Sequence, residues 1–529
     1  MALTPPWHAH GSACLTQASF DTLAFLRAWQ AWTNAHVHST TTTQHARHLH
    51  VLAWTAQPVQ PEAVVNAAAP HPELQPLAQQ LAAQCWGLLP GMHRLRFAQG
   101  HLTLTLCVGP QSEWPEFDAL LSAHPTGPCP ASANLPTLPE RSVTIIGAGI
   151  AGAGTARALA ERGWQVTVLD AGAEPAAGAS GLPVGVVAPH TSHDDSGVSR
   201  LSRAGLRLME QTMRDLLQEG VDWGCTGVRE RRLPGKTRRG GVPLSWLHEH
   251  EHAHTANDWT HKAPPPAPDD AYWHPRGAWL RPARLVRALL NHPNIHWQGH
   301  AHADALRCTT PTTAAHNIAS MWQVLQGNTV LAESTRVVIC AGPGSAALMA
   351  TATADGSSPR INPLRGQVSW GLMTDVPADA YLPATPVNGN GSFVHHIASP
   401  EGPAWYAGAT YDRLNDQPLL LDSDHTENLE RLRALEPATA EALAPSFQNG
   451  HVRGWAGVRC GVHDRLPMTG RVHNAPEGLY MNTAMGSRGL TLGLLCGELL
   501  AAQWHGEPLP IEARLAKFLD ATRFKPKPQ

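Results

Sequence analysis

The chain has 529 residues, of which 43% are hydrophobic and 15% are charged, and its formal net charge is −3. This composition is typical of a soluble globular protein with about two to four domains, and it excludes a largely disordered chain. Because the net charge is small and negative, any surface that binds nucleic acid must be a local patch.

The nine cysteines are scattered along the chain and include no CxxC pair. An odd number of isolated cysteines predicts reduced thiols, which are typical of a cytoplasmic protein and not of a disulfide-bonded secreted one. The sequence has no apolar run of about 18 residues that would predict a membrane-spanning helix. It also lacks the pattern of a signal peptide. We therefore expect a cytoplasmic protein without a membrane span.

Residues 1–139 are predicted to form a small α/β unit that ends in a linker. The hydrophobic pattern predicts two helices and two strands, at 23–32, 76–85, 48–54 and 102–108. The stretch 125–139 is rich in proline, alanine and serine, as linkers are. We find no catalytic or metal-ligating spacing in this unit, and we predict no metal site.

A strand, a glycine-rich turn, a helix and a second strand follow one another from Ser142 to Asp170. In the turn GAGIAG, Gly147 allows a tight bend, Gly149 lets the backbone approach a pyrophosphate and Gly152 lets the helix pack on the strand. The helix N-terminus would face the diphosphate. Asp170 stands where an acid binds ribose hydroxyls, which favours FAD or NAD over NADP. The alternative is a glycine-rich turn without a ligand.

Further segments could contact a flavin nucleotide. The turn 178–181 could wrap a phosphate or the flavin, the strand 336–342 would close the sheet beside its first strand, and a helix from 489 would direct its positive end at the flavin. Strands near 364–368 and 408–411 could form an antiparallel sheet over it. The predicted cofactor contacts are Gly147, Gly149, Gly152, Asp170, Ala179, Ser180, Gly181, Ala341, Gly342, Gly486, Ser487, Arg488, Gly489 and Leu490.

Two polar segments remain open to more than one interpretation. The basic cluster RERRLPGKTRR at 229–239 is either a solvated loop or a patch that contacts phosphates. The alternating histidines of HEHEHAH, at 248–254, could hold a metal ion if they lay on one strand. A polar loop before the proline-rich stretch is the expected structure of the second segment.

Together these motifs resemble the D-amino-acid oxidase type of FAD-dependent amine oxidoreductase. The order agrees: GAGIAG with Asp170, GASG, RVVICAG, GVRCGVHDRLPMTG and GSRGLT. More narrowly, residues 140–520 are similar to the C-terminal domain of the MnmC family of bifunctional tRNA-modifying enzymes, in GASGLPVGVVAP, GAWLRPARL, LRGQVS, GATYDR and MGSRGLTL. The resemblance implies an α/β fold, with a Rossmann-type FAD-binding domain and an antiparallel-sheet substrate domain.

The same resemblance implies how the chain is divided. Residues 1–139 would be a truncated methyltransferase-like region, and residues 140–529 the FAD-dependent oxidoreductase. Within the oxidoreductase we expect FAD-binding parts at 140–225, 275–345 and 455–529, and substrate-binding parts at 226–274 and 346–454.

The first region is similar to the methyltransferase half of that family in FLRAWQAW, LHVLAW and LLPGMHRLRFAQGHLTLTL. In place of the family's glycine-rich S-adenosylmethionine loop it has 19–25 without a glycine, and Thr55 stands where an acid is expected. The turn after 102–108 has lost its aspartate, and beyond Leu121 the chain passes almost directly into the linker. We therefore predict a degenerate region whose methyltransferase activity is lost.

The resemblance implies FAD-dependent oxidation of the 5-carboxymethylaminomethyl group of a tRNA wobble uridine to 5-aminomethyl, with release of glyoxylate. A separate methyltransferase would then act in the same pathway. Arg459 is the first candidate to bind the substrate carboxylate, because its planar fork suits that group, although a structural ion pair is an alternative role. Arg488 would lie near the flavin ring or the substrate. Gln367 and Tyr411 are weaker candidates, and Tyr411 could equally be a core residue.

Two other functions stay open at this point. One is an FAD-dependent oxidase of a free small amine or amino acid, such as glycine, sarcosine or a D-amino acid. The other is a tRNA-binding protein without enzymatic activity. Salt-sensitive tRNA binding would favour the tRNA-modifying enzyme over the free-amine oxidase, and a yellow purified protein would argue against the non-enzymatic function.

Overall fold

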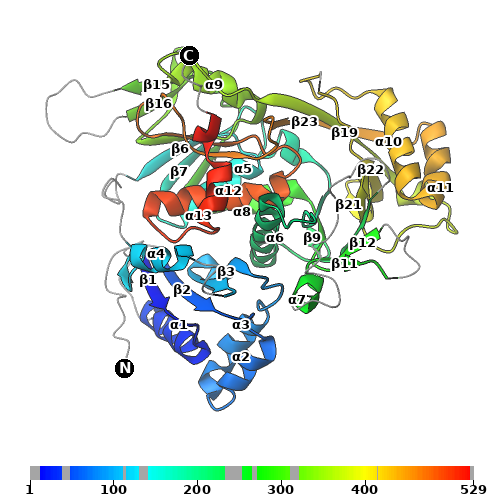
Figure 1. Cartoon of the computed structure of the whole chain (residues 1–529). Helices are drawn as coiled ribbons and strands as arrows, with labels where there is room; N and C mark the ends of the chain where they lie inside the picture. The colour runs from blue at the N-terminus through cyan, green and yellow to red at the C-terminus, as the bar shows by residue number, and fades with distance from the viewer. Residues whose placement is uncertain are drawn as a thin grey trace.

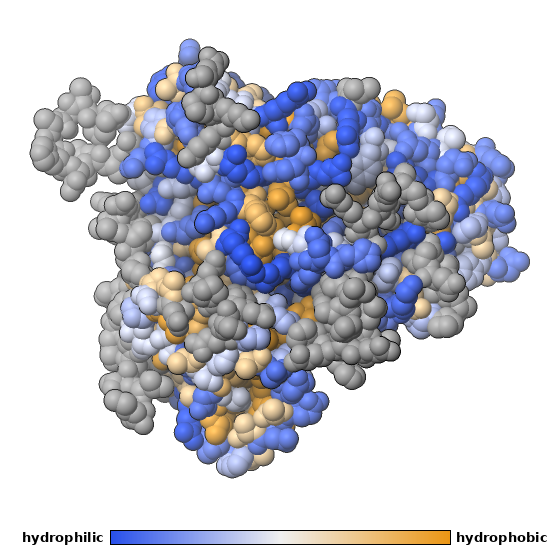
Figure 2. Space-filling view, viewed as in Figure 1, coloured by the Kyte–Doolittle hydropathy of each residue, from blue (hydrophilic) through white to orange (hydrophobic). Residues whose placement is uncertain are grey.

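The computed structural model describes residues 12–37, 48–110, 115–129, 141–232, 253–264, 271–309, 321–413 and 415–524. In Figure 1 an N-terminal unit, coloured blue, lies against a larger body formed by the rest of the chain. Figure 2 shows the same face, with apolar residues at its centre framed by hydrophilic ones. No helix in the described part of the chain is long and apolar enough to cross a membrane.

The larger body contains a six-stranded sheet in the order β14-β7-β6-β18-β25-β24. All neighbours are parallel except the last pair, and the strands are β6 (Ser142–Ile146), β7 (Gln165–Leu169), β14 (Ile295–Gln298), β18 (Arg336–Ile339), β24 (Met468–Arg471) and β25 (Leu479–Thr483). The sequence predicted β6, β7 and a late strand beside the first one, and β18 does pair with β6. The predicted Rossmann-type sheet is therefore present.

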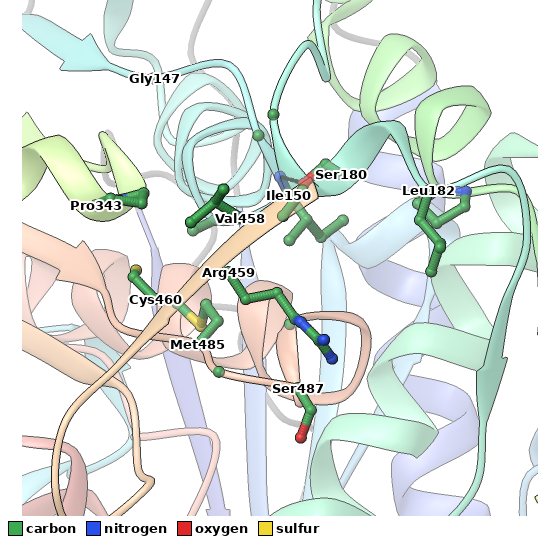
Figure 3. Close-up of a pocket in the computed structure, with 18 of the residues that line it drawn as sticks. Gly147, Ile150, Ser180, Leu182, Pro343, Val458, Arg459, Cys460, Met485 and Ser487 are labelled. Atoms are coloured by element: carbon green, nitrogen blue, oxygen red, sulfur yellow. Dashed lines mark hydrogen bonds between the residues drawn. The ribbon is translucent and has the colours of Figure 1, made fainter. Parts of the chain in front are cut away.

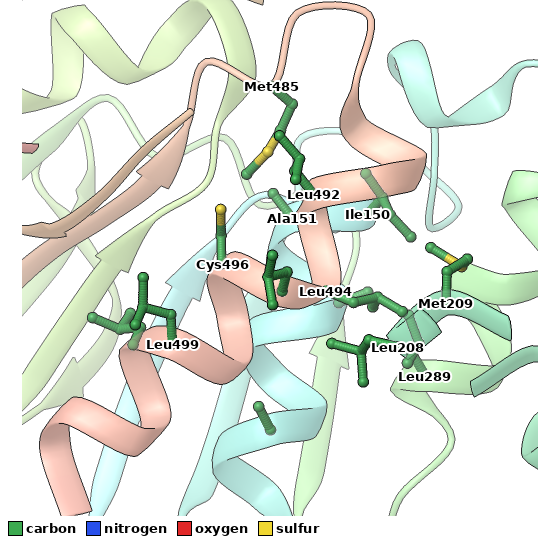
Figure 4. Close-up of a cluster of buried hydrophobic side chains, with 14 of the residues drawn as sticks. Ile150, Ala151, Leu208, Met209, Leu289, Met485, Leu492, Leu494, Cys496 and Leu499 are labelled. Carbon is green, nitrogen blue, oxygen red and sulfur yellow. The ribbon is translucent and has the colours of Figure 1, made fainter. Parts of the chain in front are cut away.

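Two helices, α5 (Ile150–Ala160) and α12 (Gly489–His505), pack on this sheet, and two more, α6 (Gly197–Leu216) and α8 (Pro282–Leu290), pack on them. Glycines allow α5 and α12 to touch, because a Cβ on Gly497 would lie 2.8 Å from the backbone nitrogen of Thr155. Figure 4 shows the apolar side chains between these helices, among them Leu208, Leu492 and Leu494. This core fixes the glycine turn before α5 and the loop before α12 relative to each other.

An eight-stranded sheet stands beside the first, in the order β11-β12-β10-β20-β21-β22-β19-β23. Its strands are β10 (Val228–Arg231), β11 (His261–Lys262), β12 (Ala271–His274), β19 (Asn362–Leu372), β20 (Val387–Gly389), β21 (Gly391–Ser399), β22 (Gly402–Gly408) and β23 (Arg453–Gly461). The helices α10 (Asp422–Leu435) and α11 (Pro437–Gln448) lie beside its β19–β22 part (Figure 1). Of the predicted strand at 408–411 only Gly408 is in a strand, because β22 ends there.

The strand β23 changes the division of the chain that the sequence suggested. The family resemblance implied that residues 455–529 belong to the FAD-binding part. Instead, residues 453–461 are extended and pair with β19 through nine successive residue pairs, from Trp370–Arg453 to Asn362–Gly461. This strand is an edge of the eight-stranded sheet, and the chain enters the six-stranded sheet only at β24.

The described part of the larger body also contains two three-stranded sheets and three short α-helices. They are the sheet of β8 (Gly185–Val187), β13 (Ala278–Leu280) and β9 (Trp223–Gly224), the sheet of β15 (Ala305–Thr309), β16 (Met321–Gln326) and β17 (Thr329–Ser334), and the helices α7 (Ala253–Asn257), α9 (Ser345–Ala352) and α13 (Ala513–Leu519).

The N-terminal unit has a five-stranded sheet in the order β3-β4-β2-β1-β5. Its elements are β1 (Ala13–Gln17), α1 (Thr22–Val37), β2 (Leu49–Thr55), α2 (Pro61–Ala68), α3 (Gln75–Ala82), β3 (Gly91–Phe97), β4 (Leu102–Val108), α4 (Pro115–Ala123) and β5 (Gly127–Pro128). The four predicted elements are all present. The sequence did not predict β3, because its polar residues His93, Arg94 and Arg96 interrupt the apolar pattern.

A buried ionic network joins the two units. The Arg162 guanidinium lies 2.8 Å from Glu507 and 3.0 Å from Glu498, and all three side chains are almost fully enclosed. From the N-terminal unit, Ser12 donates a hydrogen bond of 2.7 Å to Glu507, and His50 lies 3.5 Å from it. Burial alone would raise the pKa of Glu498, but Arg162 lowers it to about 2. The N-terminal unit thus shares an interior with the larger body.

Two buried histidines predict how stability depends on pH. Burial lowers the pKa of His48 and of His505 to about 3 in each case, against about 6.5 in an unfolded chain. Between these values the unfolded chain binds a proton that the folded chain does not. The unfolding free energy should therefore fall as the pH drops from 6.5 toward 3, by about 1.4 kcal/mol per pH unit for each histidine.

Urea unfolding at pH 7, 6 and 5 measures this slope. The His505 ring accepts a hydrogen bond of 2.9 Å from Trp164 Nε1, which protonation of that nitrogen would break. The variant His505→Gln removes one titrating group, so its slope should be shallower than that of the wild type. An equal slope in both proteins would contradict the assignment of His505 to this dependence.

Candidate active site

A cavity of about 850 Å³ lies between the two large sheets. One wall is made by the loops that follow the parallel strands β6, β7, β18 and β25, and the other by β19, β21, β22 and β23. Ligands of open α/β sheets bind beyond the carboxyl ends of the strands, which is where this cavity begins. Its volume falls within the range of sites that enclose large ligands. Figure 3 shows the glycine turn, β23 and the loop around Met485 facing this space.

At the nucleotide end the backbone leaves no room for side chains. Gly147 has φ +109°, and a Cβ there would lie 2.4 Å from the Cys340 carbonyl oxygen. A Cβ on Gly152 would lie 1.8 Å from the Gly147 oxygen, and one on Gly149 would lie 3.2 Å from Ser180 Oγ. The structure thus places all three glycines where a side chain would crowd its neighbours, which is compatible with the predicted turn and helix contact. The approach of a pyrophosphate to Gly149 stays a prediction.

Asp170 is held at the edge of the cavity by two backbone groups. Ala148 N–H donates to its Oδ2 at 2.6 Å, and Gly172 N–H donates to its Oδ1 at 2.8 Å. Each carboxylate oxygen keeps a second acceptor position, which suits the hydroxyls of a ribose. Ser180 Oγ accepts a hydrogen bond of 2.9 Å from Ile150 N–H at the start of α5. The glycine cradle, this carboxylate and the shape of the cavity fit FAD.

Most residues predicted to contact the cofactor line this one cavity. They are Gly147, Gly149, Asp170, Ala179, Ser180, Ala341, Gly342, Gly486, Ser487, Gly489 and Leu490. Three others are not among the lining residues: Gly152 lies against Gly147, Gly181 lies against the Ala176 carbonyl, and Arg488 stands between the lining residues Ser487 and Gly489.

Arg459 extends from β23 into the cavity on the side of Ser487 (Figure 3). Its Nη2 donates a hydrogen bond of 3.0 Å to the Thr410 carbonyl, and its Cζ lies 4.3 Å from the centre of the Tyr411 ring. A Cβ on Gly366, in the neighbouring strand β19, would lie 2.1 Å from that Nη2. The glycine of LRGQVS therefore makes room for the guanidinium. Arg459 forms no ion pair with any carboxylate that the structure describes.

Arg488 and Tyr411 lie at the rim of the cavity. The Nη1 of Arg488 donates a hydrogen bond of 3.0 Å to the Arg465 carbonyl. Burial lowers the pKa of Arg488, the positive charge of Arg465 lowers it further, and Tyr411 opposes both. Tyr411 lines the cavity but remains 49% exposed, so it is not a core residue.

Gln367 lies apart from the other candidates. It is fully buried, and its Oε1 accepts hydrogen bonds from Arg365 at 3.0 Å and from Leu421 N–H at 2.8 Å. Its Nε2 donates to the Leu421 carbonyl at 2.9 Å. The side chain thus ties β19 to the start of α10, and it is not among the residues that line the cavity. Alternation along β19 explains this placement, since its neighbours Gly366 and Val368 face the other side.

Several lining residues were not predicted. The hairpin 388–392, with the sequence NGNGS, forms part of the wall, together with Leu182, Val184, Val394, Tyr406 and Met485. An Asn-Gly turn is a hairpin signal and could have been recognised. The apolar residues carry no signal of their own, because a core residue and a cavity residue have the same pattern in a sequence.

The basic cluster at 229–239 is only partly described. Arg229 forms an ion pair of 2.6 Å with Glu436, and Arg231 donates a hydrogen bond of 2.8 Å to the Leu435 carbonyl. Arg232 pairs with Glu230. These three arginines make contacts within the protein, which favours neither a solvated loop nor a phosphate patch for the part of the cluster that the structure describes. Residues 233–239 and the histidines at 248, 250 and 252 lie outside the described residues.

Comparison with known proteins agrees with this geometry. Residues 142–503 match the family model of the FAD dependent oxidoreductases. The chain is 38% identical to the tRNA 5-methylaminomethyl-2-thiouridine biosynthesis bifunctional protein MnmC of Polaromonas naphthalenivorans, over 98% of this chain and 92% of that protein. It is 40% identical to the protein of the same name from Paracidovorax citrulli, over 95% and 90%.

Solved structures share the fold of the larger body. Glycine oxidase from Geobacillus kaustophilus superposes with a TM-score of 0.52 at 18% identity, over 70% of this chain and 97% of that protein. L-Proline dehydrogenase from P. horikoshii superposes with a TM-score of 0.51 at 14% identity, over 73% and 98%.

Proposed function

This chain belongs to the MnmC family of FAD-dependent oxidoreductases, and on that premise we propose that it oxidises the 5-carboxymethylaminomethyl group of the wobble uridine in tRNA. The products would be the 5-aminomethyl uridine and glyoxylate. The observation that carries the proposal is that one cavity is lined both by the glycine turn with Asp170 and by Arg459.

Family membership confirms the predicted enzyme class, fold and cofactor: the chain is an FAD-dependent oxidoreductase. The individual site residues are part of our proposal. Gly147, Gly149, Ser180 and Asp170 would hold the diphosphate and ribose, and the loop before α12 would lie near the flavin ring. Bound FAD would supply the acceptor for the hydride, which carries the two electrons that the substrate loses.

The substrate has a glycine-derived arm that ends in a carboxylate, and Arg459 is positioned to bind it. Among the contacts of the described residues, its guanidinium uses one donor, toward the Thr410 carbonyl. The remaining N–H groups can form a bidentate pair with the carboxylate. Such a pair would fix the CH₂ group next to the amine inside the cavity, which is the orientation that the C–N oxidation requires.

The same arginine favours the reactive form of the substrate. A neutral secondary amine carries the lone pair that assists loss of the hydride. A nearby positive charge and the partly apolar wall of Val368, Val394 and Tyr406 both disfavour the protonated amine. After oxidation, water adds to the C=N carbon and the C–N bond breaks, which gives the aminomethyl uridine and glyoxylate.

Nucleoside analysis tests the proposal. The flavin-loaded protein is incubated with tRNA that carries the 5-carboxymethylaminomethyl wobble uridine, and digested nucleosides and glyoxylate are quantified. Conversion to the 5-aminomethyl nucleoside with equimolar glyoxylate is expected. Turnover of free glycine or sarcosine without any conversion of the tRNA would instead identify a free-amine oxidase.

We further propose that the N-terminal unit transfers no methyl group. In its sheet, the parallel strands β1, β2 and β4 end at one edge, where a cofactor of this fold would bind. There Trp54 Nε1 donates a hydrogen bond of 2.9 Å to the Gly109 carbonyl, and Phe20 N–H donates one of 2.7 Å to the Trp54 carbonyl. The alignment to the Polaromonas protein spans 609 positions, whereas this chain has 529 residues. At least 80 positions of that alignment therefore have no counterpart in this chain.

The expected result is therefore no binding of S-adenosylmethionine by calorimetry, and no methyl group in aminomethyl-uridine tRNA after incubation with radiolabelled S-adenosylmethionine. A methyltransferase that makes 5-methylaminomethyl uridine serves as the positive control on the same tRNA. Methyl transfer by this chain alone would refute the loss of activity, and with it the prediction of a separate methyltransferase in the pathway.

A further inference from the structure

Tyr411 is an exposed aromatic residue whose ring lies against an arginine. Its ring lines the cavity and is 49% exposed. Arg459 lies over the ring, with Cζ 4.3 Å from its centre, and Arg431 lies 6.0 Å from that centre. Arg431 is itself held by Glu427 and by a hydrogen bond of 2.9 Å to Asn390. An aromatic ring that is anchored on an arginine and open to solvent can accept a second flat group.

The rim around this ring is positively charged. Arg488 follows Ser487, which lines the same cavity as Tyr411, and it donates a hydrogen bond to the carbonyl of Arg465, whose own side chain is exposed. Neither Arg465 nor Arg488 forms an ion pair with a carboxylate in the part of the chain that the structure describes. Positive charge beside an open aromatic face is the combination that binds single-stranded nucleic acid, because arginines contact phosphates and aromatic rings stack on bases.

We propose that Tyr411 is a base-stacking platform, on which the uracil ring of the substrate stacks while Arg459 binds the opposite face of the tyrosine. The proposal rests on the proposed function, since it needs a nucleic-acid substrate. The short arm on the uracil would then pass the edge of the tyrosine and reach the guanidinium of Arg459. Such a platform would distinguish a nucleoside-linked amine from a free amino acid, which has no base.

The test measures RNA binding and oxidation separately. A fluorescein-labelled anticodon stem-loop with the 5-carboxymethylaminomethyl wobble uridine is titrated with the flavin-loaded protein by anisotropy. Loss of one stacked base weakens binding by about 5- to 150-fold, so Tyr411→Ala should raise Kd and the KM for tRNA within this range. Tyr411→Phe keeps the ring and should restore both values. The control Tyr381→Ala removes a tyrosine that is equally exposed but does not line the cavity.

Salt dependence separates stacking from charge. Tyr411→Ala should leave the slope of log Kd against log salt unchanged, because it releases no counterion, whereas Arg465→Ala should lower that slope. A stem-loop with 5-iodouridine at the wobble position should cross-link to Tyr411 on irradiation, as mapped by mass spectrometry of the peptides. A cross-link confined to other residues would refute the platform.

The outcomes separate this proposal from the proposed function. If the wild type binds the stem-loop through Tyr411 but oxidises no tRNA, the platform is supported and the proposed reaction is refuted. If Tyr411→Ala binds and oxidises tRNA as the wild type does, the proposed reaction is supported and the platform is refuted. If the wild type does not bind the stem-loop, both proposals are refuted.

Discussion

Replacing Arg459 by methionine is expected to lower kcat/KM for the modified tRNA by about 30- to 1000-fold, which corresponds to about 2–4 kcal/mol. The reason is that the substrate carboxylate would enter a partly apolar cavity without its charged partner. Arg459→Lys keeps the charge but loses the planar fork, so an intermediate loss is expected. Steady-state kinetics with the tRNA, together with the flavin absorption spectrum of each variant, measure the effect.

The control for this experiment is on the same strand. Arg453 lies six residues away on β23, pairs with the exposed Glu401, and does not line the cavity. Arg453→Met should stay within about twofold of the wild type, since exposed ion pairs contribute little. Gly366→Ala should behave like a mild Arg459 variant, because its Cβ would displace the guanidinium. Unchanged kinetics in Arg459→Met would assign the carboxylate to another residue.

Replacing Arg162 by methionine is expected to lower the free energy of unfolding by about 3–5 kcal/mol, because two buried carboxylates lose their partner. Its guanidinium lies within 3.0 Å of both Glu498 and Glu507. Burial disfavours the charged form of the Glu507 carboxyl and would raise its pKa. Arg162, and after it His50, nevertheless hold that pKa well below its ordinary value. Without Arg162 both carboxyls should bind protons at higher pH. Urea unfolding with a constant m-value measures the change.

A neighbouring ion pair provides the comparison. Arg157 pairs with Glu161 at 2.6 Å, one helical turn apart, and the Arg157 side chain is 19% exposed against 3% for Arg162. Arg157→Met should be less destabilising than Arg162→Met, because Glu161 keeps Arg96 at 3.5 Å as a second partner. Adding Glu498→Gln and Glu507→Gln to Arg162→Met removes the two carboxylates that have lost their charged partner, so part of the stability should return. If Arg162→Met and Arg157→Met were equally destabilising, the buried network would have no special role.

Most residues that the sequence proposed as cofactor contacts line one cavity in the structure. Gly147, Gly149, Ser180 and Asp170 could be identified because each has a backbone or hydrogen-bonding task that few residue types can perform, at a fixed distance from a strand or a helix end. These local requirements leave a pattern in a single sequence. The Rossmann-type sheet was predictable for the same reason.

The substrate end was less predictable, because it is built from residues far apart in the chain. Gln367 and Gly366 are adjacent in sequence, but strand alternation places one in a buried network and the other under the Arg459 guanidinium. Which face of β19 looks into the cavity depends on its neighbour β23, which lies about 90 residues later in the sequence. A glycine-rich motif, such as the one at 453–461, can therefore form a strand as well as a turn.

The shared interior of the two units has a consequence for how this protein can evolve. Deleting the N-terminal unit would leave Glu507 without Ser12 and His50, and would uncover Trp259, whose ring packs against Trp86 at 4.8 Å between centres. A gene that lost this segment would therefore produce an oxidoreductase with an exposed apolar and charged surface. Selection on the folding of the flavoenzyme is then sufficient to retain the N-terminal unit, whatever chemistry that unit performs.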